Sequence, residues 1–220
     1  MVKALAWFPA VGAFIGAVGG GIAWLAWQGF SQAIGAWIGL AAIAFLTGGL
    51  HLDGFADTLD GLGSWKDREK TLEVMRDSRI GAAGAAGLVF LLSIQWSAIR
   101  QMAPEFWFQA LTGIGALSRF GMVLSAQLFP YVPGRSGVGR LVTDRRSPGS
   151  VAVAFLSAAG IALACFGWKN GITLLAGAAA AAWGINLLFL RWLGGVTGDT
   201  MGAVNELVTT LLLLLLLVAG

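Results

Sequence analysis

Apolar runs long enough to cross a bilayer recur from one end of the chain to the other. A transmembrane helix needs about 20 consecutive apolar residues, and short polar segments separate such runs here. The pattern therefore predicts an all-α fold, a polytopic transmembrane helical bundle with about seven spans. The predicted spans cover 4–26, 33–50, 84–100, 107–129, 150–168, 172–190 and a last run ending in the leucines 211–217.

Composition favours one integral-membrane catalytic domain over residues 1–220 and no separate soluble domain. Hydrophobic residues make up 57% of the chain and charged residues 11%, whereas soluble domains are about 25% charged. The apolar run after Lys3 is longer than a signal-peptide core, so we expect it to be retained. Gly12, Gly16 and Gly20 form a small-residue face on the first span, which predicts close helix packing.

The positive charges of the polar segments predict the orientation of the bundle. With seven spans, eleven lysines and arginines fall on one side, and only Arg100 and Lys169 fall on the other. Positive residues are enriched in cytoplasmic loops. The N-terminus and the three polar segments 51–81, 130–149 and 194–206 are therefore expected on the cytoplasmic side, where they can converge on one site.

An acidic stretch within the first polar segment is the strongest chemical signal. Asp53, Asp57 and Asp60 follow the helical spacing that places side chains on one face. Like charges at this spacing repel each other unless a cation lies between them. Mg²⁺ prefers a small number of hard oxygen ligands and shares them with substrate phosphates. The chain has a single cysteine, which argues against a zinc site. The stretch therefore predicts a magnesium site that handles phosphate.

Four further charged residues are candidates for the same site. Asp77 offers another carboxylate for the metal, and Arg76 and Arg79 are suited to clamping phosphate oxygens. The presence of the two arginines is explained nearly as well by a charge pair at a helix end, together with the general enrichment of positive residues in cytoplasmic loops. Arg119 lies inside a predicted span, where an arginine usually faces a polar cavity or a partner.

The two later polar segments supply candidates for binding substrate. Arg135 and Ser136 belong to a glycine-rich basic loop, for which anion binding and topological anchoring are equally good explanations. Asp199, Asn205 and Glu206 precede a very apolar helix. Asp199 or Glu206 can complete the metal shell, and capping of the helix by this segment is the alternative.

Histidine and aromatic residues complete the set of candidates. His51 can bind substrate or act as a base near neutral pH, and capping of the span junction is the alternative. Trp65, Trp107 and Tyr131 are candidates for stacking against a flat ligand. Acidic residues, arginines and a metal together imply phosphoryl or nucleotidyl transfer, because cations offset the charge that builds on phosphorus.

The motifs are similar to those of a known enzyme family. The run GGLHLDGFADTLDGLGS, followed by MRDSRIGAAG, and the later GRSG and TGDTMGAVNE segments resemble the bacterial and archaeal cobalamin synthases, the adenosylcobinamide-GDP ribazoletransferases. The resemblance covers essentially the whole chain, and its first motif is highly specific.

The resemblance implies the last assembly step of the cobalamin nucleotide loop in the prokaryotic cytoplasmic (inner) membrane. α-Ribazole or its 5′-phosphate joins adenosylcobinamide-GDP, GMP leaves, and adenosylcobalamin or its 5′-phosphate forms with Mg²⁺ as cofactor. The implied partners are these small molecules and the lipid bilayer, with no nucleic acid and with a homo-oligomer left open. The implied metal ligands are Asp53, Asp57, Asp60 and Asp77, and one carboxylate, such as Asp57 or Asp60, or else His51 would take the proton from the ribose 3′-hydroxyl. The implied phosphate-binding residues are Arg76, Arg79, Arg119 and Arg135.

Two other functions remain as alternatives. A CDP-alcohol phosphotransferase also has an aspartate-glycine motif on membrane helices, but the Ala-Arg pair and long gap of that motif are absent after Asp53 and Gly54. An ion-coupled transporter also uses membrane carboxylates, usually near the midplane and often within internal repeats. The carboxylates here cluster at span ends, which favours the enzyme.

Overall fold

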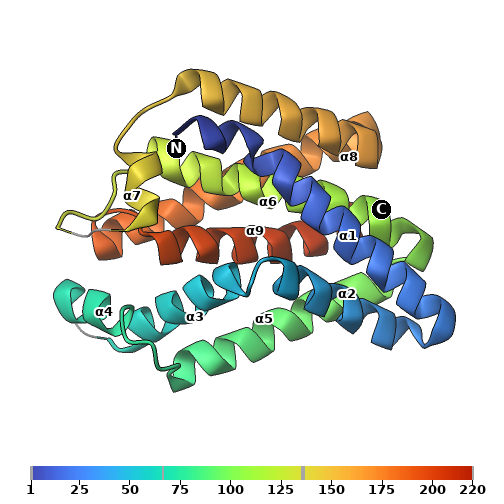
Figure 1. Cartoon of the computed structure of the whole chain (residues 1–220), viewed down its shortest axis with the longest axis horizontal. Helices are drawn as coiled ribbons and strands as arrows, with labels where there is room; N and C mark the ends of the chain where they lie inside the picture. Colours follow the sequence, from blue (N-terminus) through green and yellow to red (C-terminus); the bar gives the residue numbers. More distant parts are fainter. Residues whose placement is uncertain (1, 66, 135–136, 220) are drawn as a thin grey trace.

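The computed structural model describes residues 2–65, 67–134 and 137–219, and these fold into a bundle of helices (Figure 1). One isolated β bridge joins Tyr131 to Val196. The helices are η1 (Val2–Trp7), α1 (Phe8–Gly29), α2 (Gln32–Leu46), α3 (Leu50–Gly63), α4 (Arg68–Val74), α5 (Ala82–Gln101), η2 (Pro104–Phe106), α6 (Trp107–Leu128), α7 (Val138–Thr143), α8 (Pro148–Leu193) and α9 (Gly198–Ala219).

The helical fold class is confirmed, but the count of about seven spans is not. In the described part of the chain, four helical segments are long and apolar enough to cross a membrane: Val2–Gly29, Ala82–Gln101, Pro148–Leu193 and Gly198–Val218. The bent pair α2 and α3 raises the number to five if it forms one broken span. Helix α6 fills the place of a predicted span but is not in this set, since Arg119 and several other polar residues interrupt its apolar sequence.

Helix α8 is two antiparallel arms joined at a break. Gly167 has φ 72° and ψ 176°, which no α-helix contains. Beyond the break the chain folds back, so that a Cβ at Gly171 would lie 2.9 Å from the carbonyl oxygen of Ala162. The two arms match the predicted runs 150–168 and 172–190, with the break two residues before the expected turn at Lys169.

The predicted second span, 33–50, is shorter than expected. Helix α2 has 15 residues, about 22 Å of length, against a hydrocarbon core of about 30 Å. Gly48 and Gly49 follow with φ of 60° and 71°, a conformation that glycine adopts readily. Helix α3 then starts at a bend of 89°, so much of the expected loop 51–81 is helical.

Glycines let α1 and α6 pack with their backbones in contact, as the small-residue face predicted. A Cβ at Gly12 would overlap the carbonyl oxygen of Gly115, and one at Gly16 would overlap that of Leu111. At Gly20 the nearest atom would be the Trp107 carbonyl oxygen at 2.7 Å. Only glycine permits this separation, and α6 thereby becomes the centre of the bundle.

We expect Gly16→Ala to separate α1 from α6 and to lower the thermal unfolding temperature measured in detergent. Overpacking of this kind typically costs about 1–3 kcal/mol. Gly21→Ala is the matched control on the same helix, because its nearest atom would lie 3.9 Å from the added carbon. Equal unfolding temperatures for the two variants would contradict the packing described here.

Candidate active site at one end of the bundle

The three polar segments of the sequence meet at one end of the bundle (Figure 1). The bridge between Tyr131 and Val196 ties the second segment to the third through two hydrogen bonds. The amide of Val132 donates to the Val196 carbonyl at 3.0 Å, and the amide of Val196 donates to the Pro130 carbonyl at 2.9 Å. All three segments line one open cavity of about 500 Å³, so the predicted convergence is confirmed.

Asp53 stands between this open cavity and a second one. The first cavity is lined by His51, Asp53, Arg76 and Asp199, together with Tyr131. The second, of about 680 Å³, is lined by Asp53 and Asp57 on one side and by Ser78 and Ile80 on the other. We refer to the two together as the acidic cavities. Carboxylates from α3 and α9 and a guanidinium from the segment after α4 therefore face shared space.

A close crossing of α3 and α9 brings these side chains together. A Cβ at Gly54 would lie 2.8 Å from the carbonyl oxygen of Asp199, and one at Gly202 would lie 3.2 Å from the backbone of His51. Residues next to the two glycines are therefore held near the opposite helix. Asp53 and Asp199 gain their common cavity in this way.

Asp60 has a different environment from the other two aspartates of α3. Its carboxylate accepts hydrogen bonds from the amide of Gly81 at 2.7 Å and from the amide of Gly84 at 2.8 Å. These amides lie at the N-terminus of α5, where backbone donors lack partners within the helix. Asp60 thus caps α5, and it lines neither of the acidic cavities.

We expect Asp60→Ala to destabilise the protein by about 1 kcal/mol, the usual cost of losing a helix cap. The thermal unfolding temperature in detergent measures this loss. Asp53→Ala is the matched control, because Asp53 is exposed on the same helix and its carboxylate faces the open cavities. If Asp60→Ala unfolds no earlier than the control, the capping role is wrong.

Asp77 and Arg79 pair with each other at the protein surface. The guanidinium Nη2 of Arg79 lies 2.6 Å from the carboxylate of Asp77. These hydrogen bonds lower the pKa of the Asp77 carboxyl to about 2, so the pair is lost only as the pH falls towards that value. Exposed pairs add little stability. The structure therefore favours the helix-end pair over metal or phosphate binding for these two residues.

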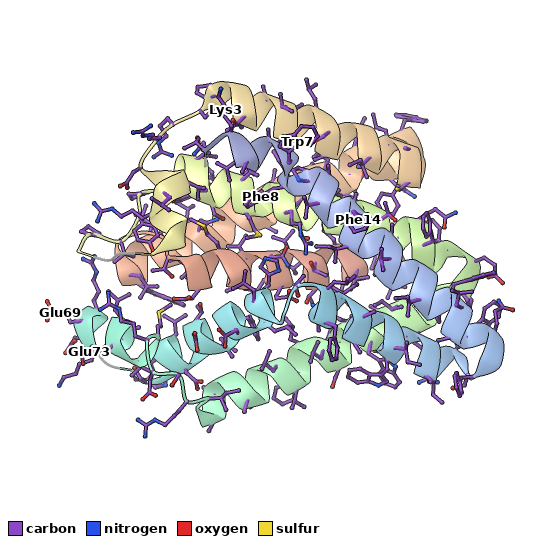
Figure 2. The ribbon with its side chains drawn as sticks, viewed as in Figure 1. Lys3, Trp7, Phe8, Phe14, Glu69 and Glu73 are labelled. Atoms are coloured by element: carbon purple, nitrogen blue, oxygen red, sulfur yellow. The ribbon has the colours of Figure 1, made fainter. Side chains whose placement is uncertain are left out.

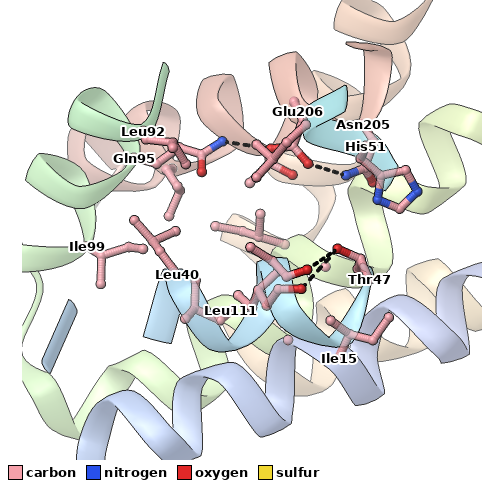
Figure 3. A pocket seen from close by; sticks show the side chains of 18 of the residues that line it. Ile15, Leu40, Thr47, His51, Leu92, Gln95, Ile99, Leu111, Asn205 and Glu206 are labelled. Carbon is pink, nitrogen blue, oxygen red and sulfur yellow. Dashed lines mark hydrogen bonds between the residues drawn. The ribbon is translucent and has the colours of Figure 1, made fainter. Parts of the chain in front are cut away.

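Arg119, Asn205 and Glu206 line a separate inner cavity of about 50 Å³. Figure 3 shows Asn205 and Glu206 beside this cavity together with Gln95 and His51. Glu206 accepts hydrogen bonds from the side-chain amides of Gln95 at 3.2 Å and Asn205 at 3.1 Å. His51 lines both this cavity and the open one. The inner cavity therefore adjoins the acidic cavities at His51.

Two features of the inner cavity went unnoticed in the sequence. Gln95 is buried on α5, and its side-chain amide also donates to Thr210 at 3.0 Å. In the sequence, the only indication of this role was a polar amide side chain within an apolar run. Within the described part of the chain, the buried Oδ1 of Asn205 has no hydrogen-bond partner. A cavity of this volume holds a few water molecules, which suits an unpaired polar atom.

Arg119 and Glu206 are both buried and line the same inner cavity. We expect Arg119→Met to leave the buried Glu206 charge uncompensated and to cost on the order of 3 kcal/mol of stability. Thermal unfolding in detergent measures the loss. The double variant Arg119→Met/Glu206→Gln should recover part of it, because glutamine is neutral. Equal unfolding temperatures for the single and double variants would show that the charges are not coupled.

The remaining candidates fall into three groups. Arg135 and Ser136 lie outside the described residues. Of the aromatic candidates, Tyr131 lines the open cavity, whereas Trp65 is 94% exposed. Trp107 is fully buried and donates its indole N–H to the Ile99 carbonyl at 2.8 Å. Its stacking role is therefore wrong, since both its ring and its polar atom are already engaged.

The acidic cavities offer oxygen ligands for Mg²⁺. Among the described residues, no group of three or more His, Cys, Asp or Glu side chains could hold a metal ion. Mg²⁺ does not need such a group, because it usually binds one or two carboxylates together with water and substrate phosphates. Asp53 lines both acidic cavities, with Asp57 in the second and Asp199 in the first, so each cavity offers two carboxylates.

These features define a class of protein: a helical bundle with helices long and apolar enough to cross a membrane and with a charged cavity at one end. Comparison with known proteins gives the family. Residues 1–217 match the family described as cobalamin-5-phosphate synthase. The chain belongs to this family of enzymes of cobalamin synthesis.

Curated relatives support the same assignment. An adenosylcobinamide-GDP ribazoletransferase of Brevibacillus brevis is 34% identical over 97% of this chain and 87% of the relative. Proteins of the same name from a Roseiflexus species and from Klebsiella pneumoniae are 36% and 35% identical, over 93% and 98% of this chain and 75% and 87% of their own lengths. No solved structure matches the chain.

Proposed function

We propose that this protein is an Mg²⁺-dependent adenosylcobinamide-GDP ribazoletransferase. It joins α-ribazole or its 5′-phosphate to adenosylcobinamide-GDP, releases GMP and forms adenosylcobalamin or its 5′-phosphate. The observation that carries the proposal is the open cavity lined by all three motif-bearing segments. The names of the curated relatives supply the substrates.

The charges of the acidic cavities suit a diphosphate substrate. When bound, Mg²⁺ would neutralise phosphate oxygens and stabilise the leaving phosphate. Asp53 would hold it together with Asp57 in the second cavity or with Asp199 in the first. Arg76 lines the same space and would pair with further phosphate oxygens, for which a guanidinium is well matched.

A proton must leave the ribose hydroxyl as that oxygen attacks the cobinamide-side phosphorus. The new bond joins the ribose oxygen to phosphorus, and the bond from phosphorus to the GMP oxygen breaks. His51 is the favoured base, because its imidazole ring lines the open cavity beside Asp53, where a ring nitrogen can take the proton of a bound hydroxyl group. Asp60 is excluded from this role by its hydrogen bonds to the N-terminus of α5.

We also propose that the enzyme lies in the cytoplasmic membrane with the acidic cavities facing the cytoplasm. The polar segments that line these cavities carry most of the lysines and arginines of the sequence, as expected for cytoplasmic loops. Nucleotide substrates are then available from the cytoplasm without crossing the bilayer.

We expect Asp53→Asn and Asp57→Asn each to reduce GMP release by about 100-fold or more and to raise the Mg²⁺ concentration for half-maximal activity. Even partners of metal ligands typically contribute about 10–100-fold. The assay uses detergent-purified protein with adenosylcobinamide-GDP and α-ribazole, and chromatography follows GMP and the corrinoid product. Asp77→Asn is the matched control, because Asp77 is paired with Arg79 outside both cavities.

Unchanged turnover and Mg²⁺ dependence in both Asp53→Asn and Asp57→Asn would show that the metal assignment is wrong. Release of CMP from a CDP-alcohol, with no cobalamin formed, would move the chain to the phospholipid-synthesising transferases. Failure of both reactions in monodisperse protein would leave the ion-coupled transporter.

A further inference from the structure

A basic cavity lies beside α7, apart from the acidic cavities. Its volume is about 580 Å³, and its lining residues are Val2, Lys3, Leu141, Arg145, Arg146 and Ser147. Lys3, Arg145 and Arg146 are exposed. Among the lining residues that the structure describes, three are cations and none is an acid. The nearby Asp144 forms an ion pair with Arg140, whose Nε lies 2.9 Å from the Asp144 carboxylate.

A buried glutamine fixes the backbone of the segment that carries the two arginines. Gln127 of α6 is 5% exposed, and its side-chain amide donates to the carbonyls of Val142 at 2.7 Å and Arg145 at 3.1 Å. Its oxygen accepts from the amide of Ser147 at 2.7 Å. The turn into α8 is thus held by three hydrogen bonds, so the position of the cations does not depend on the surface side chains alone.

The basic cavity sits where two candidate membrane-spanning segments begin. Lys3 is near the start of Val2–Gly29, and Arg145 and Arg146 directly precede Pro148–Leu193. Figure 2 shows Lys3 and Trp7 beside the first turns of α8. Trp7 is 69% exposed and Leu156 of α8 is 67% exposed, so apolar surface continues from the cations along both helices.

From this arrangement we infer that the basic cavity binds an anionic phospholipid. The phosphate headgroup contacts Lys3, Arg145 and Arg146, and the acyl chains lie along the exposed apolar surfaces of η1, α1 and α8. Basic residues at the headgroup level attract anionic lipids, which are enriched in the cytoplasmic leaflet. The lipid reading is favoured over a free phosphate because lipid-facing surface begins directly at the cations.

Native mass spectrometry of the full chain, released from detergent in the presence of phosphatidylglycerol or phosphatidylcholine, tests this site. We expect phosphatidylglycerol to bind in preference to phosphatidylcholine. Each lysine or arginine near a membrane surface contributes about fivefold in affinity, so Arg145→Gln/Arg146→Gln should weaken phosphatidylglycerol binding about 30-fold. Arg100→Gln/Lys169→Gln is the matched control, because it removes two exposed cations outside the cavity. The control should bind as the native chain does.

Lys3→Gln provides a second variant that does not touch the turn into α8, and we expect about a fivefold loss. If Arg145→Gln/Arg146→Gln and Arg100→Gln/Lys169→Gln weakened phosphatidylglycerol binding equally, the effect would be general charge attraction and the proposed site would be wrong. Displacement of the lipid by millimolar inorganic phosphate would assign the cavity to free phosphate instead. Because binding is measured without turnover, the outcome is independent of the proposed reaction.

Discussion

The close crossing of α3 and α9 is the constraint on which the functional end of this protein depends. Gly54 and Gly202 let the two backbones approach, since a Cβ at either position would press on the opposite helix. The crossing places Asp53 and Asp199 beside one cavity and puts His51 at the junction with the inner cavity. Any side chain that widened the crossing would disturb both cavities together.

The packing of α1, α6 and α8 stabilises the rest of the bundle around this crossing. Helix α6 lies at the centre, with α1 held against it by glycines and α8 folded back along it. Its buried polar residues serve both functional regions, because Arg119 faces the inner cavity and Gln127 fixes the turn beside the basic cavity. Most of the charge is thereby collected at helix ends, and the apolar faces are left for the membrane.

The sequence predicted which segments carry the site but only partly how each side chain is used. The spacing of Asp53, Asp57 and Asp60 defines one helical face, and all three do lie on α3. Spacing could not show that Asp60 turns towards the amides of Gly81 and Gly84, because that depends on where α5 begins. Gln95 escaped notice for a similar reason, since its partner Glu206 is more than one hundred residues away in the chain.

The count of about seven spans is not confirmed, because hydropathy and backbone geometry disagree at α2 and α6. An apolar run from 33 to 50 gives no hint that Gly48 and Gly49 adopt left-handed conformations and turn the chain by 89°. The polar residues of α6 likewise reflect the central position of this helix among the other helices. They do not indicate how deeply α6 lies in the lipid.

The short α2 has a mechanical consequence. A hydrophobic segment shorter than the surrounding hydrocarbon layer thins that layer or draws on its flanking residues to compensate. The residues flanking α2 on one side are the bend and α3, which carries Asp53 and Asp57. In a bilayer, a thickness mismatch would therefore strain α3 and the acidic cavities that it lines. The lipid composition of the membrane thus becomes one of the physical variables that set the geometry of these cavities.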